Sequence, residues 1–151
     1  MRLSSTDINP TRRPDRGIPD VPIKPLVLVI EDHDDTRMLL SYVLKNCGCD
    51  VFEAEDGDVG LRLANSLKPD LILMDTTLPR LDGVTVTRLI RQVHVLRDVP
   101  IFFLSGHALP EYRLKALAAG GNEYFVKPLK LRDLEAAVRK QLAQKRGIFE
   151  Q

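Results

Sequence analysis

The 151-residue sequence has little net charge, few cysteines and no long apolar run. Lys and Arg total 22 against 21 Asp and Glu, a net charge of +1, which predicts neither a nucleic-acid-binding protein nor a strongly acidic surface. Cys47 and Cys49 flank one glycine, a spacing that matches neither a zinc site nor a redox C-x-x-C motif. No apolar segment has the length of a membrane span or a signal-peptide core, so we expect a cytoplasmic protein without membrane contact.

The first 24 residues are poor in apolar side chains and show neither a strand nor a helix period. Counting Pro25, this stretch holds half of the ten prolines of the chain. We expect residues 1–24 to form a flexible arm, residues 25–146 one folded domain and residues 147–151 a short C-terminal tip. Because so few residues follow the last helical segment, we expect no separate DNA-binding domain in this chain.

From Leu26 onward, five short β-favouring runs alternate with five segments of helical period. The β-favouring runs cover residues 26–30, 51–54, 71–74, 101–104 and 124–126, and the helical segments cover about residues 36–47, 57–67, 83–93, 110–119 and 131–145. This alternation predicts an α/β fold in which helices cover both sides of one parallel sheet.

The helical periods also predict buried faces and caps. Asp34 or Asp35 is the expected N-cap of the first helix. The side chains expected to be buried are Leu39, Leu40, Val43, Leu44 and Cys47 in the first helix, and Leu114, Leu117 and Ala118 in the fourth.

Polar side chains follow four of the five predicted strands at their carboxyl ends. They are Glu31 and Asp32 after the first strand, Asp75 after the third, Ser105 after the fourth and Lys127 after the fifth. Each alone has an ordinary explanation as a helix-entry residue, a turn hydroxyl or a surface charge. Because parallel strands with right-handed crossovers end on one edge of a sheet, we expect these side chains to meet there.

Carboxylates, a hydroxyl and an ammonium at one edge suit phosphoryl transfer. Three carboxylates held together repel one another unless a cation lies among them, and an oxygen ligand set with room for water suits Mg²⁺. A carboxylate such as Asp75 can attack a phosphoryl group, while Lys127 and Ser105 contact the phosphoryl oxygens. His33 and His94 are expected to be surface histidines without a metal-binding role.

With these motifs, the sequence resembles the receiver domains of the two-component response-regulator family. The matching features are the pair Glu31-Asp32, Asp75 followed by Leu78-Pro79 and Asp82-Gly83, Ser105 followed by a small residue, and Lys127-Pro128 after Tyr124. The resemblance extends from Leu26 to about Lys145. It implies a flavodoxin-like, doubly wound sheet of five parallel strands with five helices.

The resemblance implies that Asp75 accepts a phosphoryl group from a phosphohistidine on a sensor histidine kinase or a histidine phosphotransfer protein. It also implies that Mg²⁺ is held by Asp32, Asp75 and the backbone carbonyl of Thr77, with Glu31 acting through water.

A switch is implied as well. Ser105 and Lys127 contact the phosphoryl group, and Tyr124 is the aromatic residue that turns inward when Ser105 moves. Thr77 and His107 occupy positions that tune the rate of phosphoryl loss. The signal then leaves through the face formed by the fourth helix, the fifth strand and the fifth helix, towards a downstream protein target.

By this reading the protein is a stand-alone switching module and not an enzyme, and it serves as an output module or as a phosphate shuttle. One alternative is a pseudo-receiver that binds partners without phosphorylation. Another is a Mg²⁺-dependent phosphohydrolase of the haloacid dehalogenase type, which needs a second Asp where this chain has Thr77.

Overall fold

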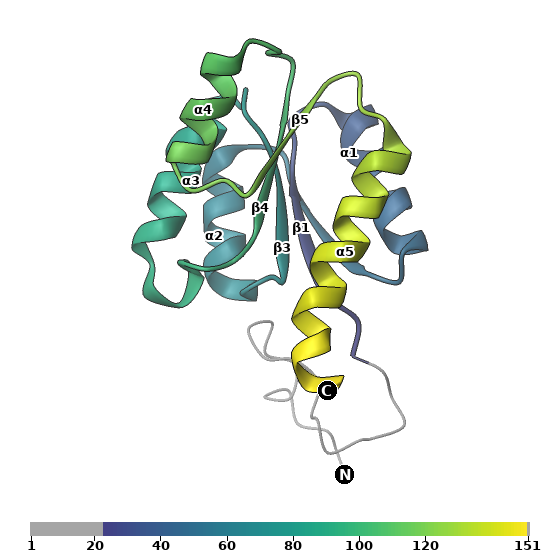
Figure 1. The fold of residues 1–151 in the computed structure, drawn as a ribbon. Helices are drawn as coiled ribbons and strands as arrows, with labels where there is room; N and C mark the ends of the chain where they lie inside the picture. The colour runs from purple at the N-terminus through teal and green to yellow at the C-terminus, as the bar shows by residue number, and fades with distance from the viewer. Residues whose placement is uncertain (1–22, 151) are drawn as a thin grey trace.

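The computed structural model describes residues 23–150, with side chains as far as Gln144 (Figure 1). The predicted arm therefore lies outside the described residues, except for its last two. The elements in chain order are β1 (Leu26–Ile30), α1 (Asp34–Asn46), β2 (Asp50–Ala54), α2 (Gly57–Leu67), β3 (Leu71–Asp75), α3 (Gly83–Gln92), the 3₁₀ turn η2 (His94–Leu96), β4 (Ile101–Ser105), α4 (Pro110–Ala118), β5 (Glu123–Val126) and α5 (Leu131–Glu150).

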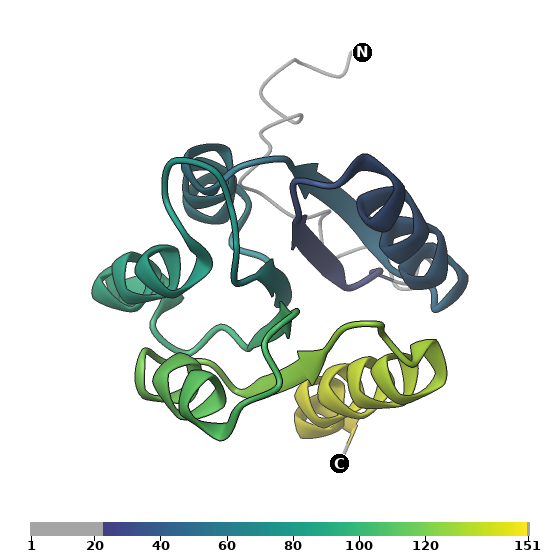
Figure 2. The same cartoon turned by 90° about the horizontal axis from the view of Figure 1, so that it is seen from above.

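The five strands form one parallel sheet in the order β2-β1-β3-β4-β5. Helices α1 and α5 cover one face, and α2, α3 and α4 cover the other (Figure 2). The predicted doubly wound α/β fold is thus confirmed. The strand order reverses between β1 and β3, and in such sheets the crevice beyond the carboxyl ends at this reversal is where ligands bind.

The three central strands are continuous buried runs, because helices cover them on both sides. Every residue of β1, β3 and β4 is buried, while the edge strands β2 and β5 are partly exposed. In the register, Asp75 pairs with Leu104 and Ser105 pairs with Val126. The last residue of β3 and the last residue of β4 are therefore the polar ones that reach the carboxyl edge.

Two apolar cores lie on the two faces of the sheet. The core under α2, α3 and α4 includes Ile30, Met74, Ile90, Phe103 and Ala116. The core under α1 and α5 includes Val29, Leu40, Leu44, Phe102 and Val138. Alternate residues of each central strand point into opposite cores, which fixes the direction of the polar residues that follow.

The buried face predicted for α4 is wrong, and the buried face predicted for α1 is wrong at Leu39. Leu114 is 66% exposed and Leu39 is 45% exposed, whereas Ala116 is fully buried. Apolar residues occur on nearly every side of α4, so its sequence period does not define one buried face. The small Ala116 allows α4 to lie close to the sheet.

Two helix ends also differ from the predictions. Helix α1 has His33 at its N-cap without a side-chain cap, and Asp34 and Asp35 lie in its first turn. Asp34 instead forms an ion pair with Arg37 at 2.5 Å. Helix α5 continues to Glu150, so most of the predicted tip is helical. None of the helices in residues 23–150 combines the length and the hydropathy of a membrane span.

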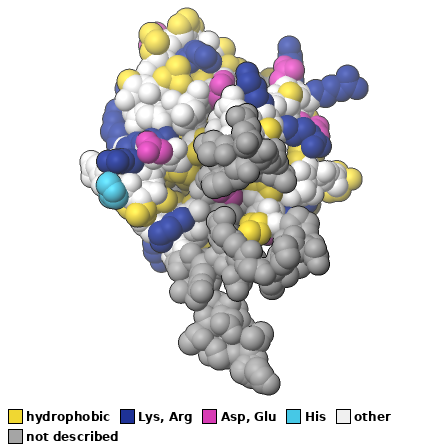
Figure 3. All heavy atoms as spheres, turned by 60° about the horizontal axis from the view of Figure 1, so that its bottom comes forward, with side chains coloured by type: hydrophobic (Ala, Val, Ile, Leu, Met, Phe, Trp, Pro, Cys, Tyr) yellow, Lys and Arg dark blue, Asp and Glu magenta, His cyan; other side chains and the backbone are white. Residues whose placement is uncertain are grey.

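The two ends of the sheet differ in their distribution of charge. Figure 3 brings forward the end at which the strands begin, and on the part of this face that described residues form, basic side chains lie at several places with single acidic ones between them. At the other end, the carboxylates that follow β1 and β3 come together.

Candidate functional site

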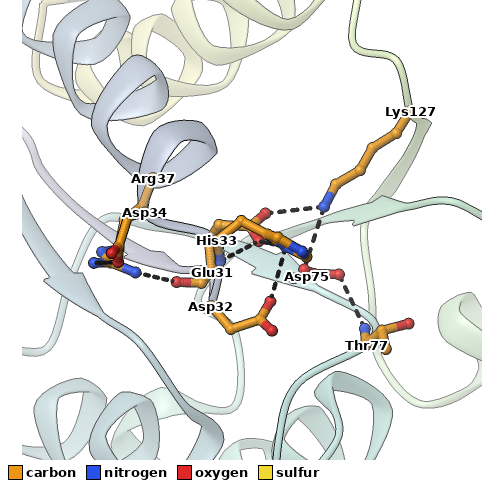
Figure 4. Close-up of polar contacts among 8 residues, drawn as sticks. All are labelled: Glu31, Asp32, His33, Asp34, Arg37, Asp75, Thr77 and Lys127. Atoms are coloured by element: carbon orange, nitrogen blue, oxygen red, sulfur yellow. Dashed lines mark hydrogen bonds and ion pairs between the residues drawn. The ribbon is translucent and has the colours of Figure 1, made fainter.

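The carboxylates of Glu31, Asp32 and Asp75 meet at the carboxyl edge of the sheet, as predicted (Figure 4). Glu31 follows β1 and is fully buried, and Asp75 ends β3 and is 2% exposed. Each of these residues, together with His33, offers one ligand atom, and the four atoms lie within 4.8 Å of one another. We call these four residues the acidic site.

Lys127 extends from the end of β5 to the acidic site. Its Nζ lies 3.0 Å from Oε1 of Glu31 and 3.2 Å from Oδ2 of Asp75. Burial lowers the pKa of Lys127, but the two carboxylates outweigh this effect and raise it. Lys127 therefore stays protonated and compensates one of the buried negative charges.

The buried carboxylates share their charge unequally. Burial, followed by the neighbouring Glu31, raises the pKa of Asp75 to about 7. Burial also acts to raise the pKa of Glu31, but hydrogen bonds with Asp75, the His33 amide and Lys127 together lower it. Without a further cation, Asp75 therefore takes up a proton more readily than Glu31 does.

The loop after β3 fixes the direction of the Asp75 carboxylate. The amide of Thr77 donates a hydrogen bond of 2.9 Å to Oδ1 of Asp75. The amide of Gly83 bonds the carbonyl of Thr76 at 3.1 Å, and a Cβ at Gly83 would overlap the carbonyl oxygen of Asp75. Glycine at position 83 therefore allows α3 to begin directly against the end of β3. The role of the Thr77 carbonyl as a metal ligand stays a prediction.

Ser105 lies beside the acidic site, where two donors hold its hydroxyl oxygen. The Thr76 hydroxyl donates to it at 2.9 Å, and the His107 amide donates at 3.1 Å. Both bonds use Ser105 Oγ as the acceptor, so its own O–H remains available as a donor.

The predicted switch residue Tyr124 is buried, with 7% of its surface exposed. Its hydroxyl donates a hydrogen bond of 2.8 Å to the carbonyl of His107. The His107 ring stacks on Tyr112 of α4, with ring centroids 4.2 Å apart. A chain of contacts thus runs from Thr76 through Ser105 and His107 to Tyr124. The movement of Ser105 and Tyr124 stays a prediction.

Three contributors to the site were not predicted from the sequence. Thr76 holds the hydroxyl of Ser105, and Arg37 Nη1 donates to the carbonyl of Glu31 at 2.8 Å. His33 was expected to be a surface residue without carboxylate partners at metal spacing, and this second point is wrong, because its Nδ1 lies 3.2 Å from Oε2 of Glu31. Its position directly after the acidic pair was the available signal.

The donor set fits a divalent cation. Oδ1 of Asp32 is a buried oxygen that accepts no hydrogen bond from any described residue. A buried acceptor without a donor is costly, and a cation beside it would remove the cost. The carboxylate oxygens are ligands of the type that Mg²⁺ takes.

Comparison with known proteins decides the family. The model of the response regulator receiver domain matches residues 27–139. The chain belongs to the response-regulator receiver-domain family. The transcriptional regulatory protein PrrA of Mycobacterium tuberculosis is 39% identical over 123 residues, which cover 82% of this chain and 52% of PrrA. The alkaline phosphatase synthesis regulator PhoP of Bacillus subtilis is 35% identical, covering 75% of this chain and 46% of PhoP. The receiver domain thus spans about half the length of these curated relatives.

Solved structures support the same assignment. The receiver domain of a sensor histidine kinase from Pseudomonas aeruginosa PAO1, described with a magnesium ion coordinated in its active-site cleft, is 34% identical. Its TM-score is 0.74, covering 80% of this chain and 98% of that one. The chemotaxis protein CheY4 of Vibrio cholerae is 26% identical with a TM-score of 0.74, covering 78% and 98%.

Proposed function

We propose that this receiver domain accepts a phosphoryl group on Asp75, in a Mg²⁺-dependent step, from a phosphohistidine of a sensor histidine kinase or a histidine phosphotransfer protein. The observation that carries the proposal is the burial of Asp75 against Glu31, with Lys127 at 3.2 Å and, beside them, an oxygen of Asp32 that accepts no hydrogen bond from the described residues. Buried carboxylates that have one cationic side chain among them favour the arrival of a second cation. This cation and Lys127 together then offset the negative charge of an incoming phosphoryl group.

In the proposed step, a carboxylate oxygen of Asp75 forms a bond to phosphorus while the P–N bond of the donor phosphohistidine breaks. The bonding electron pair leaves with the imidazole nitrogen, and the product is an aspartyl phosphate. The Thr77 amide holds Oδ1 of Asp75, and Lys127 lies at Oδ2. The carboxylate is thereby aligned before the donor arrives, which is the main requirement of phosphoryl transfer.

When bound, Mg²⁺ supplies the positive charge that keeps Asp75 ionised and neutralises a phosphoryl oxygen. Asp32 and Asp75 would hold it directly, together with the carbonyl of Thr77, while Glu31 acts through water. Lys127 then turns from the carboxylates towards the phosphoryl group, and the free O–H of Ser105 donates to another of its oxygens.

The added charge gives the domain two states. A phosphoryl group brings a charge of about −1.5 to −2 and three acceptor oxygens, which draw Ser105 and Lys127 inward. Moving Ser105 breaks its bonds with Thr76 and the His107 amide, and so shifts the loop to which Tyr124 is bonded. The signal passes in this way to the face made by α4, β5 and α5, where a downstream protein binds.

The domain itself acts on no external substrate. It works in the cytoplasm as a phosphorylation-controlled module or as an intermediate carrier of phosphate, and both roles use the same step at Asp75. The transcriptional relatives, which are about twice as long, support the first role for any protein that carries this domain.

Incubation with acetyl phosphate and Mg²⁺, followed by intact-protein mass spectrometry, tests the proposal. We expect the mass of one phosphoryl group to be gained with Mg²⁺ and not with EDTA, and Asp75→Asn to gain none. Asp70→Asn is the matched control, because Asp70 lies at the other end of β3 and is also buried. No gain by a folded protein that binds Mg²⁺ would favour the pseudo-receiver alternative.

A further inference from the structure

We infer that His33 is a direct nitrogen ligand in the acidic site, so that the site binds imidazole-preferring divalent ions, such as Ni²⁺, Cu²⁺ and Zn²⁺, more tightly than its carboxylates alone would. The inference rests on the proposed function, since it concerns the same site. It adds the chemical class of ion that the site selects.

The first observation is the place of the imidazole. His33 Nδ1 lies 3.2 Å from Oε2 of Glu31, to which its N–H donates a hydrogen bond, and 3.3 Å from Oδ1 of Asp32 (Figure 4). A metal ion that binds here would replace the Nδ1 proton, which would be released to solvent. Metal–ligand bonds of about 2.1 Å place neighbouring ligands about 3.0 Å apart in an octahedral site and about 3.4 Å apart in a tetrahedral one. The nitrogen therefore already stands at the spacing of a ligand beside Asp32, which would hold the ion directly.

The second observation is the state of the oxygen that His33 faces. Oδ1 of Asp32 is buried and accepts no hydrogen bond within residues 23–150, and its contact with His33 Nδ1 at 3.3 Å leaves its lone pairs available to a cation. The His33 side chain is 72% exposed, and its ring makes no cap for α1. The ring is thus placed by the carboxylates and not by packing, and it can follow a cation that enters between them.

The chemistry of the donor atoms decides which ions bind more tightly when an imidazole is added to the carboxylates. Mg²⁺ prefers oxygen and water ligands, whereas imidazole suits Mn²⁺ weakly and Ni²⁺ and Zn²⁺ strongly, in the order of their general affinities. A site of carboxylates with one imidazole therefore holds Mg²⁺ with its oxygens alone. It holds Ni²⁺ with an additional bond that Mg²⁺ scarcely uses.

Calorimetric titration of the whole protein with MgCl₂ and with NiCl₂ measures this difference. The variants are His33→Gln, which keeps a polar side chain, and His33→Phe, which keeps a ring. His94→Ala is the matched control, because His94 is an exposed histidine outside the acidic site. We expect both His33 variants to lose Ni²⁺ affinity at least tenfold while Mg²⁺ affinity changes less than twofold, and His94→Ala to match the wild type.

A spectroscopic readout separates ligation from an indirect effect. Electron spin echo modulation of the Cu²⁺-loaded protein should show the ¹⁴N of a coordinated imidazole in the wild type and in His94→Ala, and none in His33→Gln. Equal losses of Mg²⁺ and Ni²⁺ affinity in His33→Gln, or no ¹⁴N signal in the wild type, would overturn the inference and leave the proposed function standing. A wild-type protein that binds no Mg²⁺ would overturn the proposed function itself.

Discussion

A buried aspartate lies at each end of β3, Asp70 directly before the strand and Asp75 as its last residue, and the two have opposite surroundings. At the beginning, Asp70 is 9% exposed, and its Oδ2 accepts a hydrogen bond of 2.8 Å from the amide of Leu26. The Asp70 amide in turn donates to the carbonyl of Leu26 at 2.8 Å. At the end, Asp75 is 2% exposed and lies against the carboxylate of Glu31.

Burial of a carboxylate is thus used in two ways within one strand. Asp70 satisfies a backbone donor and connects β3 to the start of β1, which stabilises the fold. Asp75 is held in a place where its charge is unfavourable until a cation comes, which costs stability, and in the proposed function this placement prepares Asp75 for phosphoryl transfer. Residue type and burial do not distinguish the two roles, but the partners do.

The largest effect is expected from Asp70→Ala. Removing this carboxylate leaves the buried amide of Leu26 without its acceptor, which should lower the free energy of unfolding by roughly 1–3 kcal/mol. Urea denaturation of the wild type and the variant measures the change. A loss below a few tenths of a kcal/mol would show that Asp70 does not stabilise the fold and would contradict the contrast with Asp75.

Asp75→Asn should raise the free energy of unfolding when no metal is present, whereas Asp70→Ala should lower it. The amide has nearly the shape of the carboxyl group and removes its repulsion from Glu31, so stability in EDTA at pH 8 should rise by about 1–2 kcal/mol. Thermal unfolding measures the difference. Saturating Mg²⁺ should reduce or reverse the difference in stability between the variant and the wild type, because only the wild type keeps all the carboxylate ligands. A variant less stable than the wild type in EDTA would contradict the unfavourable placement of Asp75.

The stability of the metal-free wild type should depend on pH, because ionising the buried Asp75 destabilises the fold. The folded-state pKa of Asp75 is raised to about 7, above its ordinary value near 3.9. A raised pKa gives stability that is fully present below about pH 4 and is lost as the pH rises through about 7. Between pH 5 and pH 8 the wild type should therefore lose stability relative to Asp75→Asn. Parallel curves for the two proteins would show that Asp75 does not titrate in this range.

Tyr124→Phe should have the smallest effect. It removes one hydrogen bond, from the Tyr124 hydroxyl to the His107 carbonyl, so we expect about 1 kcal/mol of lost stability. The phosphoryl group should still be gained, since Tyr124 does not contact Asp75. Loss of phosphorylation in this variant, measured by intact mass, would place the switch residue inside the reaction and contradict its separation from the acidic site.

The parallel sheet and the meeting of Glu31, Asp32 and Asp75 at its edge were predictable, because alternating periods and the rule of right-handed crossovers place every strand end on one edge. The buried face of α4 was not predictable, because its apolar residues do not follow one helical period. Packing around Ala116 decides which side of this helix is buried. The hydroxyl bond between Thr76 and Ser105 and the nearness of His33 to Glu31 depend on side-chain directions within loops, which the sequence pattern does not contain.

Locating the phosphoryl bond tests the central claim most directly. After reaction with acetyl phosphate and Mg²⁺, borohydride reduces an aspartyl phosphate to homoserine, and peptide mass spectrometry then finds the converted residue. The account predicts homoserine at position 75 alone, with Asp70 unchanged and no conversion in EDTA. Conversion at Asp32 or Asp70, or a phosphorylated protein without any homoserine, would contradict the assignment of Asp75 as the phosphoacceptor.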